Sequence, residues 1–183
     1  MTMSLDGFIA DPYDQPGELF EWYDSGDVTV QGAGMAFNVD VASAELLREI
    51  LSNTGTLIAG RRLFDITDGW NDNHPIGTPV VVVTHNPPTD AEKWPRTAFV
   101  DGVEAAITRA RQIADGKDVC IASANITQQA LELGLVDEVC VSLVPVLFGT
   151  GIPYFAASGH QLFDDPKVIQ GRRATHLRYS VRR

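Results

Sequence analysis

Two hydrophobic patterns alternate along the chain and predict alternating strands and helices. Short apolar runs rich in β-branched residues are typical of buried strands, and the four valines at 80–83 are the clearest example. Such runs predict strands at 56–60, 79–84, 98–100, 120–122 and 138–149. Between them, apolar residues recur every three or four positions, which is the spacing of an amphipathic helix.

Start signals frame the predicted helices. Ser43 is a candidate N-cap for a helix with apolar residues at 46, 47, 50 and 51. Asp101 followed by Glu104 resembles a capping box at the start of a second helix. Further helices are predicted to begin at Arg61 and at Asn125.

The two ends of the chain differ in pattern from its centre. Residues 6–37 are rich in Gly, Pro and Asp, and we expect a long loop with little regular structure there. Residues 167–183 alternate between apolar and polar side chains and predict one or two antiparallel strands with Gly171 as a bend. Together the patterns indicate a single three-layer α/β domain over 1–183, with a central mixed sheet flanked by helices.

The composition excludes some classes of partner. The net charge of −10 argues against nucleic acid and anionic membranes, because both need clustered Lys and Arg. No apolar run is long enough to span a bilayer and no secretory leader follows Met1, so we expect a cytoplasmic location. Cys120 and Cys140 lie in apolar runs and are expected to be buried thiols. The four histidines lack metal-ligand spacing, and no metal site is expected.

Polar residues follow three of the predicted strands. In open α/β sheets, ligands lie beyond the carboxyl ends of the strands, so these positions are candidate ligand contacts. Paired arginines at a strand end suit an anionic ligand, but they also fit a solvated helix start, and the spacing leaves both interpretations open. The three stretches are Gly60-Arg61-Arg62, Thr84-His85-Asn86 and Ala122-Ser123-Ala124-Asn125-Ile126.

The third stretch leads from a strand directly into a helix. The first amides of a helix have no partner within it and its dipole favours an anion, so this corner suits a phosphate. However, no glycine lies between Cys120 and Leu133, although a phosphate usually needs one for close approach to the backbone. The corner is therefore either an altered cofactor site or a packed strand–helix connection.

Four stretches of the sequence are motifs of a known family: SLDGFIA at 4–10, GRRLFD at 60–65, VVVVTHNP at 80–87 and NITQQALELGLVDEVCVSLVPVLFGTGIPYF at 125–155. They resemble the dihydrofolate reductase-like family, and in particular its subgroup related to the reductase domain of bacterial riboflavin biosynthesis, over nearly the whole chain. The resemblance implies an NADPH cleft across the carboxyl edge of the sheet. It also implies hydride transfer to a small heterocyclic or sugar-amine substrate, as in 5-amino-6-(5-phosphoribosylamino)uracil reductase.

The resemblance implies a role for each of the three stretches. Residues 60–62 match the family's phosphate-contacting segment, and residues 84–86 match the segment beside the adenine ribose and its 2′-phosphate. Residues 122–126 match the pyrophosphate turn. Asp6 and Gly7 match the loop near the nicotinamide and the substrate.

The chain departs from the family pattern at three places. Family members usually carry Gly-Gly where this chain has Ala122-Ser123, and Thr where it has Leu63. The catalytic acid of dihydrofolate reductases is expected near Ala44, which has no proton to give. Asp6 and Glu45 remain candidate catalytic groups, although Glu45 equally fits a helix-start charge that complements the dipole.

Two functions fit these residues. The first is an NADPH-dependent reductase of the riboflavin-pathway type, with NADPH preferred to NADH because an arginine pair suits the cofactor's phosphates. The second is a non-catalytic small-molecule binding or resistance-type protein on the same fold. A homodimer is expected from the resemblance and from the apolar segment 139–155. Only three residues precede Ser4, so either the first strand is short or the native start lies further upstream.

Overall fold

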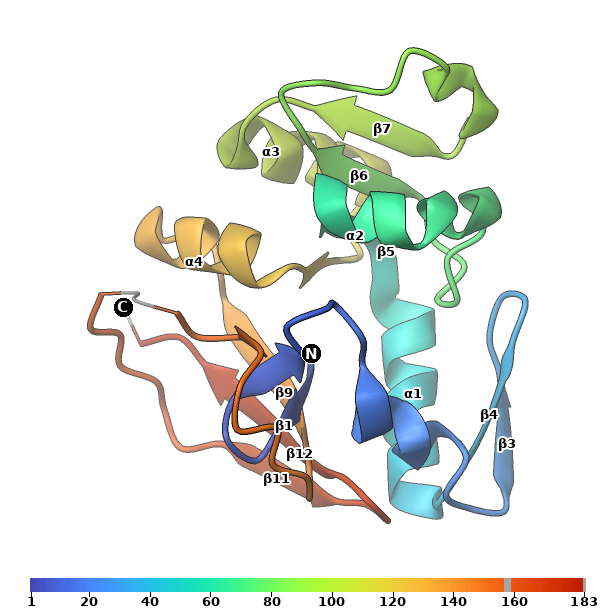
Figure 1. The fold of residues 1–183 in the computed structure, drawn as a ribbon, viewed down its shortest axis with the longest axis vertical. Coiled ribbons are helices and arrows are strands. Elements are labelled where there is room, and N and C mark those ends of the chain that lie inside the picture. Colours follow the sequence, from blue (N-terminus) through green and yellow to red (C-terminus); the bar gives the residue numbers. More distant parts are fainter. Residues whose placement is uncertain (157–158, 183) are drawn as a thin grey trace. The chain divides into compact units, whose positions relative to one another are not determined.

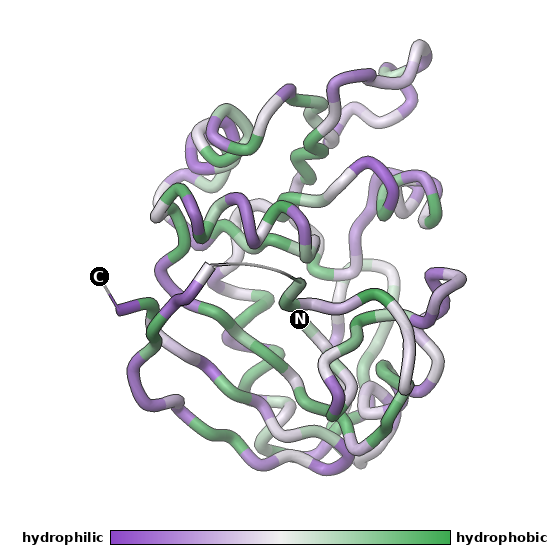
Figure 2. Tube along the Cα trace, turned by 60° about the vertical axis from the view of Figure 1, so that its left-hand side comes forward, coloured by the Kyte–Doolittle hydropathy of each residue, from purple (hydrophilic) through white to green (hydrophobic). Residues whose placement is uncertain are grey.

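The computed structural model describes residues 1–156 and 159–182, and the chain divides into two compact units. Unit 1 comprises Met1–Val30, Phe37–Leu47 and Leu131–Arg183, and unit 2 comprises Gln31–Ala36 and Arg48–Ala130. Along the chain, short hydrophobic segments are separated by hydrophilic turns (Figure 2). This pattern is the one from which the strands and helices were predicted.

Unit 2 is built on a parallel sheet (Figure 1). Gly60 is in register with Val83, which is in register with Val100. On the other side of the central strand, Ala59 is in register with Ala122. The carboxyl ends of all the strands therefore lie at one edge of this sheet. The strands, in the spatial order β7-β6-β5-β8, are β7 (Thr97–Val100), β6 (Val80–Val83), β5 (Thr54–Gly60) and β8 (Asp118–Ala122).

Helices pack against the central strands of unit 2. Both α2 (Arg61–Ile66) and α3 (Val103–Ala114) contact β5 and β6. Gly55 permits the end of α3 to approach β5, because a Cβ at Gly55 would come within 2.7 Å of the Ala114 backbone. Two 3-10 segments, η2 (Asp68–Asp72) and η3 (Ala91–Lys93), complete the unit. One buried cluster contains Leu57, Ala59, Phe64, Val80 and Val82.

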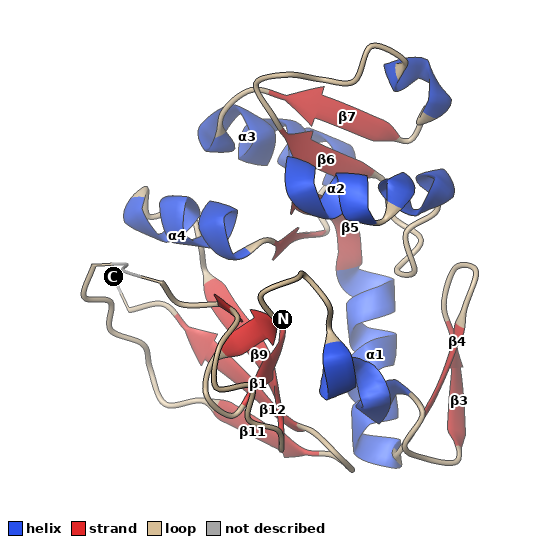
Figure 3. Ribbon diagram, in the orientation of Figure 1, coloured by secondary structure: helices blue, strands red, loops and turns tan. Residues whose placement is uncertain are grey.

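Unit 1 is built on a mixed sheet (Figure 3). Its first strand pairs in parallel with β9, and β12 pairs antiparallel with both β9 and β11. The antiparallel pair predicted for the tail, with a bend at Gly171, is confirmed. The strands, in the spatial order β1-β9-β12-β11, are β1 (Thr2–Ser4), β9 (Glu138–Val144), β12 (Thr175–Ser180) and β11 (Lys167–Gln170).

The prediction of a long loop over residues 6–37 was wrong. This segment contains short elements, and its Gly, Pro and Asp residues mark the turns between them. For example, Asp14, Gly17 and Gly34 all have positive φ. The elements are β2 (Phe8–Ala10), which pairs with β10 (Ile152–Pro153), the 3-10 helix η1 (Gly17–Tyr23), and the hairpin of β3 (Val28–Gln31) and β4 (Ala36–Val39).

Two predicted helix starts were also wrong. The helix α1 (Val41–Asn53) is capped by Asp40, whose carboxylate accepts the backbone N–H of Ala42 and of Ser43 at 3.0 and 3.1 Å. Ser43 lies in the first turn, where its hydroxyl has a buried partner instead. Residue Gly102 precedes α3 without a side-chain cap, so the capping box at Asp101 does not form. The helix α4 (Ala124–Glu132) begins one residue before its predicted start.

The two cysteines differ in their surroundings. Cys120 is half-buried and Cys140 is exposed, so the expectation of two buried thiols was wrong for Cys140. Because side chains alternate along a strand, Cys140 faces away from its buried neighbours Val139 and Val141. Within residues 1–156 and 159–182, none of the helices has the length and apolar character needed to cross a bilayer.

Candidate functional site

The three polar stretches meet at the carboxyl edge of the unit 2 sheet. Residues 60–62 follow β5, residues 84–86 follow β6, and residues 122–126 run from the end of β8 into α4. The strand register places all three at the same edge. Gly60 illustrates the closeness of two strand ends, because a Cβ there would come within 3.3 Å of the Ser123 hydroxyl.

Arg61 connects two of these strand ends. Its Nε donates to Asp65 Oδ1 at 2.7 Å, and its NH1 donates to the backbone carbonyl of Asn86. The guanidinium therefore links the first turn of α2 to the segment after β6, and it retains further N–H donors for an anion. Arg62 is exposed beside it. Arg61 is thus neither a freely solvated side chain nor fully occupied by the protein.

The stretch after β6 forms a tight turn that presents His85. The Thr84 hydroxyl accepts the Asn86 N–H at 3.1 Å and donates to the Asn86 carbonyl at 3.2 Å. The imidazole Nδ1 of His85 lies 2.5 Å from Asp101 Oδ1, and the two side chains are 83% and 71% exposed. Asp101 is the first residue after β7, so the parallel register brings this partner to His85.

The β8–α4 corner supplies donors for an anion. The Ser123 carbonyl accepts the N–H of Thr127 at 3.0 Å and its hydroxyl at 2.7 Å, which makes Ser123 the residue preceding the first helical turn. The N–H groups of residues 124–126 therefore lack acceptors within α4. The Ser123 hydroxyl makes no hydrogen bond with the residues that the structure describes. These donors fit the phosphates of a dinucleotide, although Ser123 adds a side chain where the family has glycine.

Two other departures from the family pattern lie against the core of unit 2, whereas Ala44 is buried on α1 in unit 1. Leu63 and Ala122 both pack against the cluster of buried apolar residues beside α2. Their side chains are therefore explained by packing, and Ser123 is the departure that bears on phosphate approach. The residues present at this edge fit an anionic dinucleotide.

The two candidate catalytic residues belong to unit 1. The Asp6 carboxylate accepts hydrogen bonds from the Ser4 hydroxyl at 2.6 Å and from the amides of Gly149 and Phe148 at 2.7 and 3.2 Å. The bond from Ser4 is the main reason that the pKa of Asp6 lies below its usual value. A carboxylate held in this way is a poor proton donor, but it ties together the loops that follow β1 and β9. Glu45 is exposed on α1.

Unit 1 also holds a buried polar network that sequence reasoning missed. His176 is 3% exposed, and its Nε2 and Nδ1 lie 3.0 Å from Ser43 Oγ and 2.8 Å from Ser142 Oγ. Because Ser43 donates to Asp40 at 2.7 Å, its oxygen accepts from Nε2–H of a neutral imidazole. Burial lowers the pKa of His176, and the negative charge of Asp40 offsets this only in part. No spacing in the sequence links residues so far apart.

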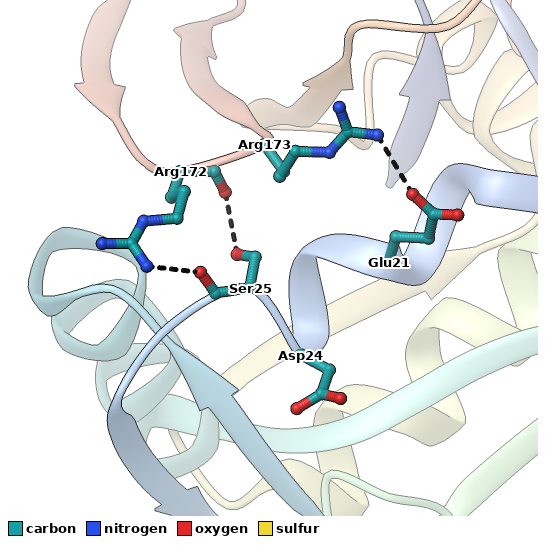
Figure 4. A pocket seen from close by; sticks show the side chains of 5 residues that line it. All are labelled: Glu21, Asp24, Ser25, Arg172 and Arg173. Atoms are coloured by element: carbon teal, nitrogen blue, oxygen red, sulfur yellow. Dashed lines mark hydrogen bonds and ion pairs between the residues drawn. The ribbon is translucent and has the colours of Figure 1, made fainter.

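A shallow hollow of about 480 Å³ opens on unit 1 beside this network. Glu21, Asp24, Ser25, Arg172 and Arg173 line it (Figure 4). Arg173 donates to Glu21 at 3.0 Å, and Arg172 donates to the Ser25 carbonyl at 3.0 Å. The two arginines thus fix the β11–β12 turn to η1 and to Ser25, whereas the Asp24 carboxylate accepts from Asn38 at 3.3 Å.

Sequence reasoning also missed the carboxylates that face two of the predicted ligand contacts. Asp65 lies four residues after Arg61 on one helix, and this spacing was a readable signal for an ion pair. Asp101 was interpreted as a helix cap, although its place directly after a strand offered the same strand-end argument that selected His85.

Comparisons with known proteins agree with this architecture. A crystal structure of a putative riboflavin biosynthesis protein from Shewanella sp. PV-4 superposes with a TM-score of 0.69 at 22% identity, covering 99% of this chain and 96% of that one. Acinetobacter baumannii RibD in form 2 superposes with a TM-score of 0.59 at 18% identity, and form 1 with 0.54 at 16%. Those two matches cover 100% and 87% of this chain, which spans only 56% and 55% of the RibD chains.

These structures share the dihydrofolate reductase-like α/β fold, which confirms the predicted fold class. No curated protein matches the sequence. The model of the family described as the RibD C-terminal domain matches residues 1–177. A match over that length shows that the chain belongs to the RibD C-terminal domain family.

Proposed function

We propose that the chain is an NADPH-dependent reductase of the riboflavin-biosynthesis type, acting on a small substrate with a carbon–nitrogen double bond. The observation that carries this proposal is the meeting of three donor-rich stretches at one carboxyl edge of unit 2. When bound, the nicotinamide supplies a hydride, and the protein contributes binding and orientation.

Each stretch has a distinct binding role in this proposal. The free amides of 124–126 and the Ser123 hydroxyl would hold the pyrophosphate. Arg61 and Arg62 would contact phosphate oxygens through charge-assisted hydrogen bonds. Residues 84–86 would lie beside the adenine ribose. In unit 1, the bonds of Asp6 to the amides of Phe148 and Gly149 would keep two strand-end loops in a fixed shape.

Titration of NADPH into the purified protein, followed by nicotinamide fluorescence, tests the proposal. We expect saturable binding that weakens in Arg61→Ala. Arg111→Ala is a matched control, because it removes the same charge from an exposed arginine in the last turn of α3, shortly before the start of β8. Ordinary cofactors bind with dissociation constants well below about 1 mM, so absence of binding at roughly millimolar NADPH would reject the reductase.

One observation favours a second candidate, a non-catalytic small-molecule binding protein. The side chain of Ser123 occupies the space beside Gly60 at the expected pyrophosphate turn. If that side chain prevents productive placement, the protein would bind a ligand without reducing it. Loss of nicotinamide absorbance in the presence of 5-amino-6-(5-phosphoribosylamino)uracil would identify the reductase, and binding of that compound without turnover would favour the alternative.

We also propose a homodimer, although fewer apolar side chains of the segment 139–155 are exposed than the sequence suggested. Val139, Val141, Val144 and Tyr154 of the apolar segment 139–155 are buried within the single chain. Leu147 and Phe155 remain 68% and 44% exposed and are the apolar side chains that a partner copy would cover. Light scattering at micromolar concentration measures the mass directly, and a clean monomer would reject the dimer.

A further inference from the structure

The side chains of His85 and Asp101 form an exposed polar contact between two neighbouring strand ends of unit 2. The 2.5 Å contact joins the segment after β6 to the first residue after β7. Exposed ion pairs contribute little to stability, because water screens them and ordering two side chains costs entropy. The contact therefore contributes little to the stability of the fold. It lies at the carboxyl edge of the sheet, where ligands bind in open α/β folds.

A second carboxylate at this edge faces Arg61. Arg61 donates to Asp65 at 2.7 Å, so Arg61 and His85 each lie against an acidic side chain. The two carboxylates differ in place. Asp65 lies on the same helix as its partner, whereas Asp101 reaches His85 from a different strand end. Of these two carboxylates, only Asp101 directly follows a strand and so places its negative charge at the carboxyl edge of the sheet.

We propose that Asp101 is a specificity-determining residue that restrains binding of a 2′-phosphate at this edge. The inference rests on the proposed dinucleotide site and concerns the ribose end of the ligand. A 2′-phosphate carries up to two negative charges and is repelled by a carboxylate. A 2′-hydroxyl, in contrast, can donate a hydrogen bond to one, as acidic residues accept from ribose in other dinucleotide folds. Asp101 thus lowers the ratio of NADPH to NADH affinity that the arginines establish.

The direction of the effect follows from counting charge. With neutral His85 the pair carries one negative charge, and with protonated His85 it is neutral. Asp101→Asn removes the negative charge and keeps an oxygen that can accept from His85. In either protonation state of His85, the variant pair is more positive by one charge, so a 2′-phosphate gains more than a 2′-hydroxyl does.

Calorimetric titration with two fragments of the cofactor isolates this end of the ligand. The fragments 2′,5′-ADP and 5′-AMP differ by the 2′-phosphate alone. We expect Asp101→Asn to raise the affinity ratio of 2′,5′-ADP to 5′-AMP by roughly three- to tenfold at low salt, as expected for one solvated charge at close range. The increase should shrink as ionic strength rises from about 0.05 to about 0.5 M. The control Asp115→Asn makes the same charge change at an exposed residue beyond the end of α3 and should leave the ratio unchanged.

Three different results would contradict the proposed role of Asp101. An unchanged ratio in Asp101→Asn, with both fragments still binding, would show that the pair is only a solvated surface contact. A lower ratio would show that Asp101 instead holds His85 in place for the phosphate. A wild type that binds neither fragment, nor NADPH or NADH, would reject the proposed function itself and this inference with it.

Discussion

His176 in unit 1 and His85 in unit 2 show how differently the two units use polar side chains. His176 is 3% exposed, and both of its ring nitrogens have hydroxyl partners. His85 is 83% exposed and contacts a single carboxylate at a strand end. A buried polar group whose partners are complete is costly to disturb, whereas an exposed pair can exchange its partner for a ligand at little cost. By this criterion, the unit 1 network is structural and the unit 2 edge is available for binding.

Removing each histidine in turn should give the largest contrast. His176→Ala leaves a cavity and removes the partner of the Ser142 hydroxyl and one of the two partners of the Ser43 hydroxyl, so we expect the free energy of unfolding to fall by about 3–5 kcal/mol. His85→Ala should change it by less than about 0.5 kcal/mol. Urea denaturation of the two variants measures both values, and similar losses would contradict the division between the units.

Acid should destabilise the protein through His74 and His176, whose pKa values are both lowered. Burial lowers the pKa of His74 from 6.5 to about 4 and also lowers that of His176. The unfolded chain therefore binds more protons than the folded protein, and the free energy of unfolding decreases as the pH falls below about 6.5. For His74 the decrease amounts to roughly 2–3 kcal/mol by about pH 4.

The variant His74→Asn tests this origin, because asparagine can still accept the Ile76 N–H that bonds to His74 Nδ1 at 3.2 Å. Its stability should vary less between about pH 6.5 and pH 4 than that of the wild type. If the free energy of unfolding of His74→Asn changed with pH as steeply as that of the wild type, His74 would not be the source of the acid sensitivity.

Asp40 affects the free energy of unfolding at lower pH than the histidines do. Partial burial tends to raise its pKa, but hydrogen bonds from the amide of Arg172 and from Ser43 keep it below its usual value, so its contribution is lost only below about pH 4.

Arg61→Ala should weaken NADPH binding by about ten- to a hundredfold, and NADH binding less. Because Arg61 also bonds to Asp65 and to the Asn86 carbonyl, loss of structure must be separated from loss of charge. Asp65→Ala breaks the ion pair and keeps the guanidinium, so its NADPH affinity should be retained or increased. Equal affinity for both cofactors, unchanged in Arg61→Ala and Arg62→Ala, would mean that these arginines form only a solvated helix start.

The smallest effect is expected at Ser123. Ser123→Gly restores the family's residue at the corner and removes the side chain beside Gly60, so NADPH should bind more tightly by less than about tenfold. Ser123→Ala keeps the Cβ and removes the hydroxyl, and it should bind no more tightly than the wild type. Isothermal titration of the two variants distinguishes crowding from hydrogen bonding. Weaker binding in Ser123→Gly would show that the hydroxyl is a net contributor.

The sequence predicted the parts of the fold that depend on local pattern. The valines of β6 and the alternation of β11 and β12 were sufficient, because each signal lies within a few consecutive residues. Helix starts were less predictable. Asp40 and Ser43 are both good capping residues, and the choice depended on His176, which lies more than a hundred residues away.

The candidate site shows the same division. The strand-end argument located residues 60–62, 84–86 and 122–126, and the register of the unit 2 sheet confirms that they share one edge. It did not reveal that Arg61 bonds to the Asn86 carbonyl or that His85 pairs with Asp101. Those contacts depend on how neighbouring strands align, which a one-dimensional pattern does not contain.

Hydrogen–deuterium exchange with and without NADPH tests the central claim most directly. The claim is that the carboxyl edge of unit 2 binds the dinucleotide and that the His176 network of unit 1 is structural. It predicts added protection in residues 122–127 and 84–86, and unchanged exchange in β12 around His176. Saturable NADPH binding that protects neither stretch of unit 2 would contradict it.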